Sequence, residues 1–599
     1  MKYTFLAVIM AVIVVTGHYE AGGKSDATQD ASLAYLMFDV SQEVYAQTPA
    51  GDRPVRRQRR ERMPGELEGK VEYYVSKLDG EQRPYVICAT DESDEPKPMV
   101  MVVHPGGTGL ENAMRLTGTY ANMIKKNGKS AVVLRPTGRG PGSLYMNYGE
   151  VDLFEAIQDA SEKYPIDPDR ISIIGYSMGG AATWYLTSHY PDFFSAGSPG
   201  AGYCDYRLWE KPGGYTFHMH DWEEPSWIAR SAVFVPENFM QTPMWVVHGD
   251  LDRSIGGGVP VAHSRRMTKL LADHGCPYKY TEIEGGGHGF SSKAPNITEE
   301  SLLWLIEQKK ERNPEHVKFS THTLRHNSSY WVTVEQLDYY GKKGTIDAEF
   351  IEPGRLIVRT ENIKTLSLGP IQNRTSVKLN MGGQELGEVD LSAKRMFRRN
   401  NEGDWKLGDF DLSKEKRHGC SGPLADLFFD NTILVTGTTG EDAETTFNRA
   451  VAGHQARLYR DRNGGVHRGG IMGQNNVELP VINDEDLSED QLKQSNLILY
   501  GTFESNSVMK RLAGKLPVEF DGKVIRIGGK TYAGDQTTVF AILPHPENPD
   551  RYVAIHGGVT VDAITYGSHI DMGLLPDYIV YSGGKTLDWG FWGSDWKAQ

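Results

Sequence analysis

The sequence predicts an α/β protein in three parts. A mostly parallel β-sheet with helices on both faces comes first, then a small β-sandwich-like domain, then a C-terminal mixed α/β domain. Over residues 67–312, short apolar strands alternate with amphipathic helices, the pattern of a parallel sheet covered on both faces. Over 313–412, apolar and polar residues alternate with a period of two, which predicts half-buried strands. Strand and helix patterns return over 413–599.

Length, charge and cysteine content limit the function classes. A chain of 599 residues is long enough for several domains. The formal net charge of -14 argues against general nucleic-acid binding. The four cysteines form no Cys-x-x-Cys pair, so neither a zinc ribbon nor a dithiol redox motif is expected. They are Cys88, Cys204, Cys276 and Cys420.

The N-terminus predicts export. Residues 1–22 combine Lys2 with an apolar run over 5–15, which is typical of a secretory signal peptide. The run is too short for an ordinary membrane span, and no later segment is long enough for one. We therefore expect a secreted or periplasmic protein, with an uncleaved N-terminal anchor as the alternative. Residues 23–66 are polar and rich in arginine towards their end, which predicts a solvated linker.

Within the first domain, apolar runs and amphipathic repeats give the order of elements. Because parallel strands carry their sites at their carboxyl ends, residues that directly follow a strand are the candidates for function. Thr298 is a plausible N-cap for the last helix. The predicted strands are 85–89, 99–104, 131–135, 170–176, 244–248 and 278–283, and the predicted helices are 112–126, 151–164, 178–190, 262–275 and 299–310.

The strand over 170–176 leads into a Gly-x-Ser-x-Gly turn formed by Gly175, Ser177 and Gly179. A turn this sharp holds its serine in a strained conformation, and its glycines leave room for the neighbouring strand and helix. The serine oxygen is thereby exposed at the helix N-terminus, which favours negative charge. This is the nucleophile elbow of the α/β-hydrolase fold.

A serine nucleophile needs a base and an orienting acid, which in α/β-hydrolases follow in the order Ser, acid, His. After the strand at 244–248 comes His248-Gly-x-x-Asp252-x-x-Ile255, and after that at 278–283 comes Gly287-His288-Gly289. With the elbow, these motifs make residues 67–312 resemble the prolyl oligopeptidase-like and dienelactone hydrolase-like serine hydrolases. The resemblance implies that Ser177 is the nucleophile, Asp252 the acid and His288 the base. Asp250 is an alternative acid, and His248, His263 and His274 are alternative bases.

The oxyanion formed during such a reaction requires backbone N–H donors. One is predicted at Met178, directly after the nucleophile. The other is expected in the loop 104–109, which resembles the His-Gly-Gly loops of the family except that Pro105 stands in place of the first glycine. We choose Gly107 as this donor, with Gly106 and Thr108 as the nearest alternatives.

An insertion over 202–241 is dense in aromatic residues and histidines. Lying over the catalytic rim, it is interpreted as a substrate-binding wall suited to sugar rings or aromatic acyl groups. His218, His220 and Trp222 are its chosen residues. Because His218 and His220 alternate on an extended chain, a metal site is the alternative, although we predict none.

Two further residues are assigned to substrate binding. Tyr176 lies inside the elbow. Arg139 follows the strand over 131–135 and is assigned to a substrate carboxylate or phosphate, with a loop ion pair as the alternative.

The C-terminal parts carry no recognisable site motif. Turns at Pro353-Gly354 and Gly382-Gly383 separate the strands of the sandwich. The last part has predicted strands at 431–437 and 496–501, each followed by a helix, but neither loop is a G-x-G-x-x-G fingerprint or a P-loop. We expect accessory domains that pack on the hydrolase or shape its entrance.

The predicted function is that of an exported serine hydrolase that cleaves carboxylic esters through an acyl-enzyme, with no metal or organic cofactor. The expected partner is a small or oligomeric ester, including carbohydrate-linked esters, and no nucleic acid is expected. A prolyl oligopeptidase-like peptidase is the alternative; in that family a large β-propeller precedes the catalytic domain, whereas 66 residues do so here. A binding protein with a vestigial hydrolase domain is the third hypothesis.

Overall fold

The computed structural model describes residues 66–106, 109–140, 142, 144–208, 219–253, 258–462, 477–521, 523–560 and 562–599. The predicted signal peptide and all of the predicted linker up to residue 65 lie outside the described residues. Within the described ranges, no helix is both long and apolar enough to span a membrane.

The first sheet has eight strands in the order β1-β2-β4-β3-β5-β6-β7-β8. The neighbours from β4 to β8 pair in parallel, while β2 is antiparallel to both β1 and β4. The predicted α/β class with a mostly parallel sheet is therefore confirmed. The strands are β1 (Lys70–Val75), β2 (Gln82–Ala89), β3 (Lys97–Val103), β4 (Val132–Pro136), β5 (Ile166–Tyr176), β6 (Ala196–Gly200), β7 (Met244–Gly249) and β8 (Tyr278–Ile283).

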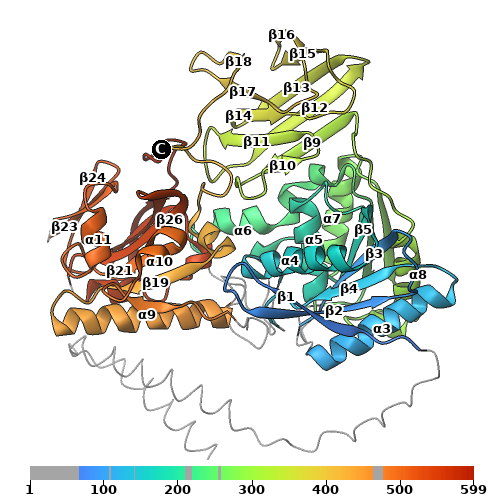
Figure 1. The fold of residues 1–599 in the computed structure, drawn as a ribbon, viewed down its shortest axis with the longest axis horizontal. Helices are drawn as coiled ribbons and strands as arrows, with labels where there is room; N and C mark the ends of the chain where they lie inside the picture. The colour runs from blue at the N-terminus through green and yellow to red at the C-terminus, as the bar shows by residue number, and fades with distance from the viewer. Residues whose placement is uncertain are drawn as a thin grey trace, which may run out of the picture. The chain divides into compact units, whose positions relative to one another are not determined.

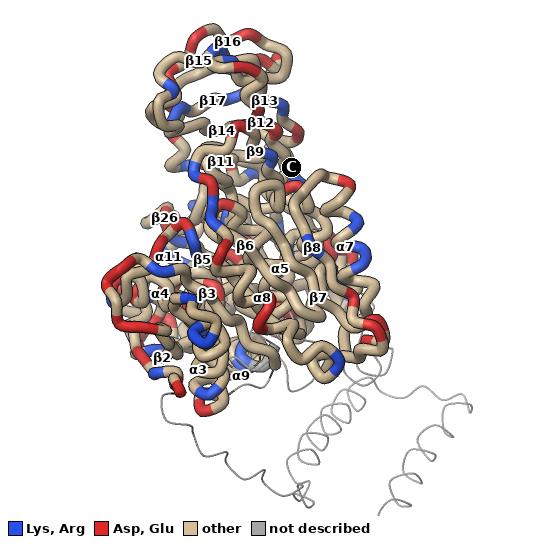
Figure 2. The backbone as a smooth tube through the Cα atoms, turned by 90° about the vertical axis from the view of Figure 1, so that its right-hand side faces the viewer, with Lys and Arg blue, Asp and Glu red and all other residues tan. Residues whose placement is uncertain are grey.

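Helices cover both faces of this sheet (Figure 1). Helices α3 and α8 share a core with one face, and α4, α5 and α7 pack on the other. Helix α5 has no Lys, Arg, Asp or Glu, so it is drawn entirely in tan in Figure 2, and it is almost entirely buried. Helix α8 has Asn296 as its N-cap, so the predicted cap at Thr298 is wrong by two residues. The helices are α3 (Leu110–Lys126), α4 (Tyr148–Lys163), α5 (Met178–His189), α6 (Glu224–Arg230), α7 (Ala262–Asp273) and α8 (Ile297–Leu305).

Two five-stranded sheets follow, in the orders β10-β11-β14-β17-β18 and β16-β15-β13-β12-β9. Apolar side chains from both sheets form one buried cluster. In β12 buried and half-buried residues alternate, as the period of two predicts. The strands are β9 (His316–Thr321), β10 (Ser328–Ser329), β11 (Val332–Leu337), β12 (Gly344–Glu352), β13 (Arg355–Glu361), β14 (Ile363–Leu368), β15 (Val377–Met381), β16 (Gln384–Val389), β17 (Arg395–Arg399) and β18 (Trp405–Leu407).

The C-terminal part holds a seven-stranded mixed sheet, β20-β19-β21-β26-β25-β27-β28, and a three-stranded sheet, β22-β23-β24. The pairs from β20 to β26 are parallel and the rest of the large sheet is antiparallel. Its elements are β19 (Thr432–Thr436), α9 (Asp442–Arg462), β20 (Val481–Asn483), α10 (Glu489–Gln494), β21 (Asn496–Tyr500), α11 (Ser507–Leu512), β22 (Val518–Phe520), β23 (Val524–Ile527), β24 (Lys530–Ala533), β25 (Thr537–His545), β26 (Asn548–Gly558), β27 (Tyr578–Ser582) and β28 (Lys585–Gly590).

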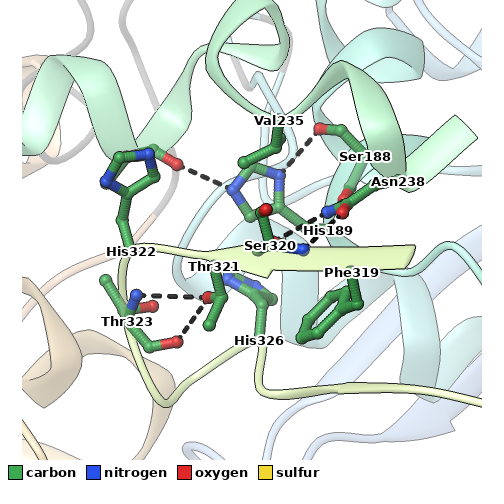
Figure 3. Close-up of a pocket in the computed structure, with 11 residues that line it drawn as sticks. Ser188, His189, Val235, Asn238, Phe319, Ser320, Thr321, His322, Thr323 and His326 are labelled. Atoms are coloured by element: carbon green, nitrogen blue, oxygen red, sulfur yellow. Dashed lines mark hydrogen bonds between the residues drawn. The ribbon is translucent and has the colours of Figure 1, made fainter. Parts of the chain in front are cut away.

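Asn238 joins the first domain to strand β9 (Figure 3). Its side-chain amide accepts the N–H of Ser320 at 2.8 Å and donates to the carbonyl of Ser320 at 2.9 Å, as a neighbouring strand would. The same Nδ2 donates to the carbonyl of Ser188 at 2.7 Å. Asn238 thus covers backbone groups on the edge of a sheet, where unpaired N–H and C=O groups invite aggregation.

Three histidines surround this junction: His189, His322 and His326. The rings of His189 and His326 lie 4.6 Å apart, and His326 Nε2 lies 2.9 Å from the buried carboxylate of Glu150 on α4. The cavity is about 10 Å³, room for roughly one water molecule. Burial lowers the pKa of His189 to about 4 and that of His322 to about 3, because a buried imidazolium loses its hydration.

The C-terminal part shares a continuous apolar core with the first domain. Tyr459 of α9 stacks on Phe428 at 4.1 Å and packs edge-on against Tyr148 of α4. Helix α6 is also anchored there, because Ser226 Oγ donates to the carbonyl of Leu574 at 2.9 Å and Arg230 donates to that of Gly573.

The buried histidines predict a loss of stability in acid. An unfolded chain protonates His322 near pH 6.5, whereas the folded protein keeps it neutral down to about pH 3. The free energy of unfolding should therefore fall as the pH is lowered from about 6.5, by about 1.4 kcal/mol per pH unit for this one group. In urea denaturation between pH 7 and pH 4, His322→Leu should lose stability less steeply than the wild type. Thr323→Val, which changes the same cavity but keeps the histidine, should follow the wild type; equal slopes for all three proteins would contradict the prediction.

Candidate active site

Ser177 stands between the end of β5 and the start of α5 with φ 59° and ψ -116°. A non-glycine residue in this region is strained and persists only where its surroundings hold it. The N–H of Ser177 donates to the carbonyl of Gly200 on β6 at 2.8 Å, which fixes the turn. The side chain is consequently presented at the carboxyl end of the sheet.

The glycines of the elbow are required by close backbone contacts. A Cβ on Gly175 would lie 2.2 Å from the carbonyl oxygen of Gly179, and one on Gly179 would lie 2.3 Å from that of Val103. A Cβ on Gly180 would lie 2.4 Å from the carbonyl oxygen of Gly200. Each contact is with backbone, which cannot move aside, so the segment from Gly175 to Gly180 accepts no side chain at these positions.

The structure brings Ser177, His288 and Asp252 into one hydrogen-bonded chain. His288 Nε2 lies 3.0 Å from Ser177 Oγ, and His288 Nδ1 lies 2.8 Å from Asp252 Oδ2. The His288 side chain is 28% exposed and that of Asp252 is 1% exposed, so the imidazole is reachable from solvent and the carboxylate is not. This is the geometry in which a histidine removes a serine proton while a carboxylate orients the ring.

Asp252 is held on both of its oxygens. Oδ2 accepts from His288 and also lies 3.1 Å from His248 Nε2, and Oδ1 accepts the N–H of Val259 at 3.1 Å. Burial alone would raise the pKa of this carboxyl, but the donors from His248 and His288 outweigh it and hold the pKa below its ordinary value. Asp252 is therefore an anion at neutral pH.

The other candidate acid and bases are placed elsewhere. His263 is buried on α7 with its Nδ1 3.7 Å from Cys204 Sγ, and the ring of His274 caps the same helix at the carbonyl of Leu270. His248 is fully buried and contacts the triad only through Asp252. Asp250 makes no contact with His288 among the contacts of the described residues, since His288 Nδ1 points to Asp252.

The oxyanion donors are described in part. Met178 is the first residue of α5, where N–H groups have no partner within the helix, so its donor is available beside Ser177. Gly107 and the alternative Thr108 lie outside the described residues. The start of their loop is fixed, because Tyr145 Oη accepts the N–H of His104 at 3.2 Å and donates to the carbonyl of Pro136 at 3.0 Å.

The assignment of Arg139 to a substrate is corrected. Its side chain is 1% exposed, and its guanidinium pairs with Asp79 and lies 3.4 Å from the buried Asp152. A third contact goes to Ser76 Oγ. The sequence left a loop ion pair as the alternative, and the structure has Arg139 in that role.

The predicted aromatic wall is largely interior. Trp222 is 4% exposed and belongs to the same apolar core as Trp227 of α6, so its faces are covered by protein. His220 is exposed and stacks on Trp222 at 5.4 Å with the rings 8° apart. His218 lies outside the described residues. Trp222 is thus a core residue rather than a ligand platform, which aromatic composition alone does not reveal.

Tyr176 holds His288 in place through its hydroxyl and its ring. Its hydroxyl donates to the backbone carbonyl of His288, and its ring lies 5.1 Å from the His288 ring and 5.4 Å from that of Phe290.

Neither Gly258 nor Val259 was singled out from the sequence, although both touch Asp252. Their signal is their position in the loop after Asp252, which a motif search does not score.

Comparison with known proteins finds similarity in this region. Residues 144–310 match the model of the prolyl oligopeptidase family. An uncharacterized secreted protein of Arthroderma benhamiae is 32% identical over 183 residues, which is 27% of this chain and 18% of that protein. A probable chloroplastic glutamyl endopeptidase of Oryza sativa subsp. japonica is 26% identical over 141 residues, 23% of this chain and 15% of that protein. The alignments thus cover less than a fifth of either relative's length.

Among solved structures, a thermostable esterase is similar with a TM-score of 0.31 and 23% sequence identity. The match covers 40% of this chain and 63% of that one.

Gly258 offers a test of how Asp252 is held. A Cβ at Gly258 would lie 2.1 Å from Asp252 Oδ1, so Gly258→Ala should push the carboxylate out of line with His288. We expect kcat/KM for an activated ester to fall about tenfold or more, since misplacement by about 1 Å can slow a reaction about a hundredfold. Gly453→Ala on α9 is the control, because its Cβ would meet Arg457 at an ordinary 3.6 Å. Unchanged activity in Gly258→Ala would mean that the loop yields without moving the acid.

Proposed function

We propose that this chain, which carries a domain of the prolyl oligopeptidase family over residues 144–310, is an exported serine hydrolase that cleaves carboxylic esters through an acyl-enzyme. The observation that carries the proposal is the hydrogen-bonded chain from Ser177 through His288 to Asp252, with the serine in a strained turn at a helix N-terminus. Export rests on the N-terminal sequence and on the similarity to a protein named as secreted.

The mechanism follows from the placement of each group. Neutral His288 takes the Ser177 proton on Nε2 as Oγ attacks the carbonyl carbon, and Asp252 stabilises the imidazolium through Nδ1–H. The tetrahedral oxyanion forms beside the Met178 N–H, a type of donor worth about 2.7–4 kcal/mol in the transition state. His288 then protonates the leaving alcohol. Water activated by the same ring attacks the acyl-enzyme and releases the acid and Ser177.

Ester cleavage is placed first because of the leaving group. An alkoxide leaves more readily than the anion of an amine, so the triad and an oxyanion donor are sufficient for activated esters without a subsite that aligns a peptide chain. A serine peptidase is the second candidate, and the similarity to a probable glutamyl endopeptidase favours it. In that case the bond cleaved would follow an acidic residue. A small or carbohydrate-linked ester remains the proposed substrate class.

A fluorophosphonate probe tests the hydrolase directly. It should label the wild-type protein on Ser177 and leave Ser177→Ala unlabelled. Hydrolysis of p-nitrophenyl acetate should fall about 10⁴-fold or more in that variant, because the nucleophile is lost while binding groups remain. Ser292, an exposed serine shortly after His288, provides the matched control, and Ser292→Ala should label normally. Absence of labelling in the wild type would leave the third hypothesis, a binding protein with a vestigial site.

Chromogenic substrates separate the first two candidates. The protein should hydrolyse p-nitrophenyl esters and leave Pro-p-nitroanilide and Glu-p-nitroanilide peptides intact. Turnover of the peptides with no turnover of the esters would reverse the order of the two proposals, and selective cleavage after glutamate would favour the peptidase similar to the rice protein.

A further inference from the structure

Asp252 Oδ2 lies within hydrogen-bond distance of two histidines. His288 Nδ1 is at 2.8 Å and His248 Nε2 at 3.1 Å. His248 is the penultimate residue of strand β7 and is completely buried, so it cannot touch a substrate. Only one of the two histidines therefore faces the reacting atoms, and the other reaches them through the shared carboxylate oxygen.

The partners of His248 place a hydrogen on its Nε2 atom. Nε2 lies 3.1 Å from Asp252 Oδ2 and 3.0 Å from the carbonyl of Val259, and both of these atoms accept hydrogen bonds only. Nε2 must therefore carry a hydrogen. Nδ1 lies 2.7 Å from Ser264 Oγ on α7, and a hydroxyl can donate to it. The Nε2–H group thus donates to Asp252, while Nδ1 is held by the Ser264 hydroxyl.

We propose that His248 is a positioning residue for the hydrolysis, and that it orients the Asp252 carboxylate towards His288 and moderates the basicity of the catalytic imidazole. This inference rests on the proposed function. Two N–H groups share one oxygen of the Asp252 carboxylate. Each histidine therefore forms a weaker hydrogen bond with that oxygen than it would form alone. The chain of contacts is Ser264, His248, Asp252, His288 and Ser177.

The surroundings leave Asp252 as the ionised partner of His248. On β8, Glu282 stands opposite His248 but pairs with Arg265, with its Oε2 2.9 Å from the Arg265 Nε. On α7, His263 is buried, and burial lowers its pKa to about 4, so it is neutral near pH 7. Tyr176 faces Asp252 from the elbow, and burial first and then the Asp252 charge raise the pKa of its phenol.

The test replaces the donor and then restores it. In His248→Leu, Asp252 loses one N–H donor and becomes more basic, which stabilises the His288 imidazolium. The acid limb of the pH profile of kcat/KM for p-nitrophenyl acetate should therefore move up by about one pH unit, with kcat down about tenfold and KM little changed. His248→Gln keeps an N–H donor and should recover most of both effects. His263→Leu, a buried histidine that does not contact Asp252, is the matched control and should keep the wild-type limb.

A second readout does not depend on turnover. With ¹⁵N-labelled histidine, the low-field proton between His288 Nδ1 and Asp252 should shift in His248→Leu and return in His248→Gln. An unmoved acid limb and an unmoved resonance in His248→Leu would overturn the inference, as would a loss of activity that glutamine does not rescue. Fluorophosphonate labelling of the wild type is scored separately: if it fails while the resonance shifts, the proposed function fails, and only the orientation of Asp252 towards His288 by His248 is supported.

Discussion

The close approach of backbone segments around Ser177 is the constraint on which the site depends. Strand β5, helix α5 and the end of β3 pack so tightly that Gly175 and Gly179 have no room for a Cβ. This packing holds Ser177 at a positive φ, and the strain is supported by a buried helix with no charged residue. The packing of the sheet core therefore determines where the Ser177 side chain points. His288 and Asp252 lie in loops that follow two other strands of the same sheet. The sheet therefore fixes the positions of all three side chains.

Local motifs made it predictable that Ser177, Asp252 and His288 lie together, because each residue lies beside a strand end within a short pattern. The α/β class was likewise evident from the alternation of strands and helices. Strand β6 was not predicted, since Ala196–Gly200 has no branched aliphatic residue and takes its strand state from β5 and β7. Such strands are set by tertiary pairing rather than by propensity.

Long-range partners explain the wrong assignments. Arg139 pairs with Asp79, which is 60 residues away, and no short pattern signals that contact. Trp222 was assigned to a ligand wall because aromatic residues suit both binding sites and cores, and only the fold decides which face is covered. The support of Asp252 by Gly258 has the same origin, since a glycine required by a close contact looks like any other glycine in a sequence.

The continuous apolar core between the first domain and the C-terminal sheet limits how the two parts can be exchanged during evolution. Residues more than 280 positions apart, such as Tyr148 and Asp430, are joined by a hydrogen bond at the edge of this core. Cutting the gene between the two parts would expose an interior on each side. Recombination that exchanges one part for a foreign module would therefore have to bring a matching interior with it.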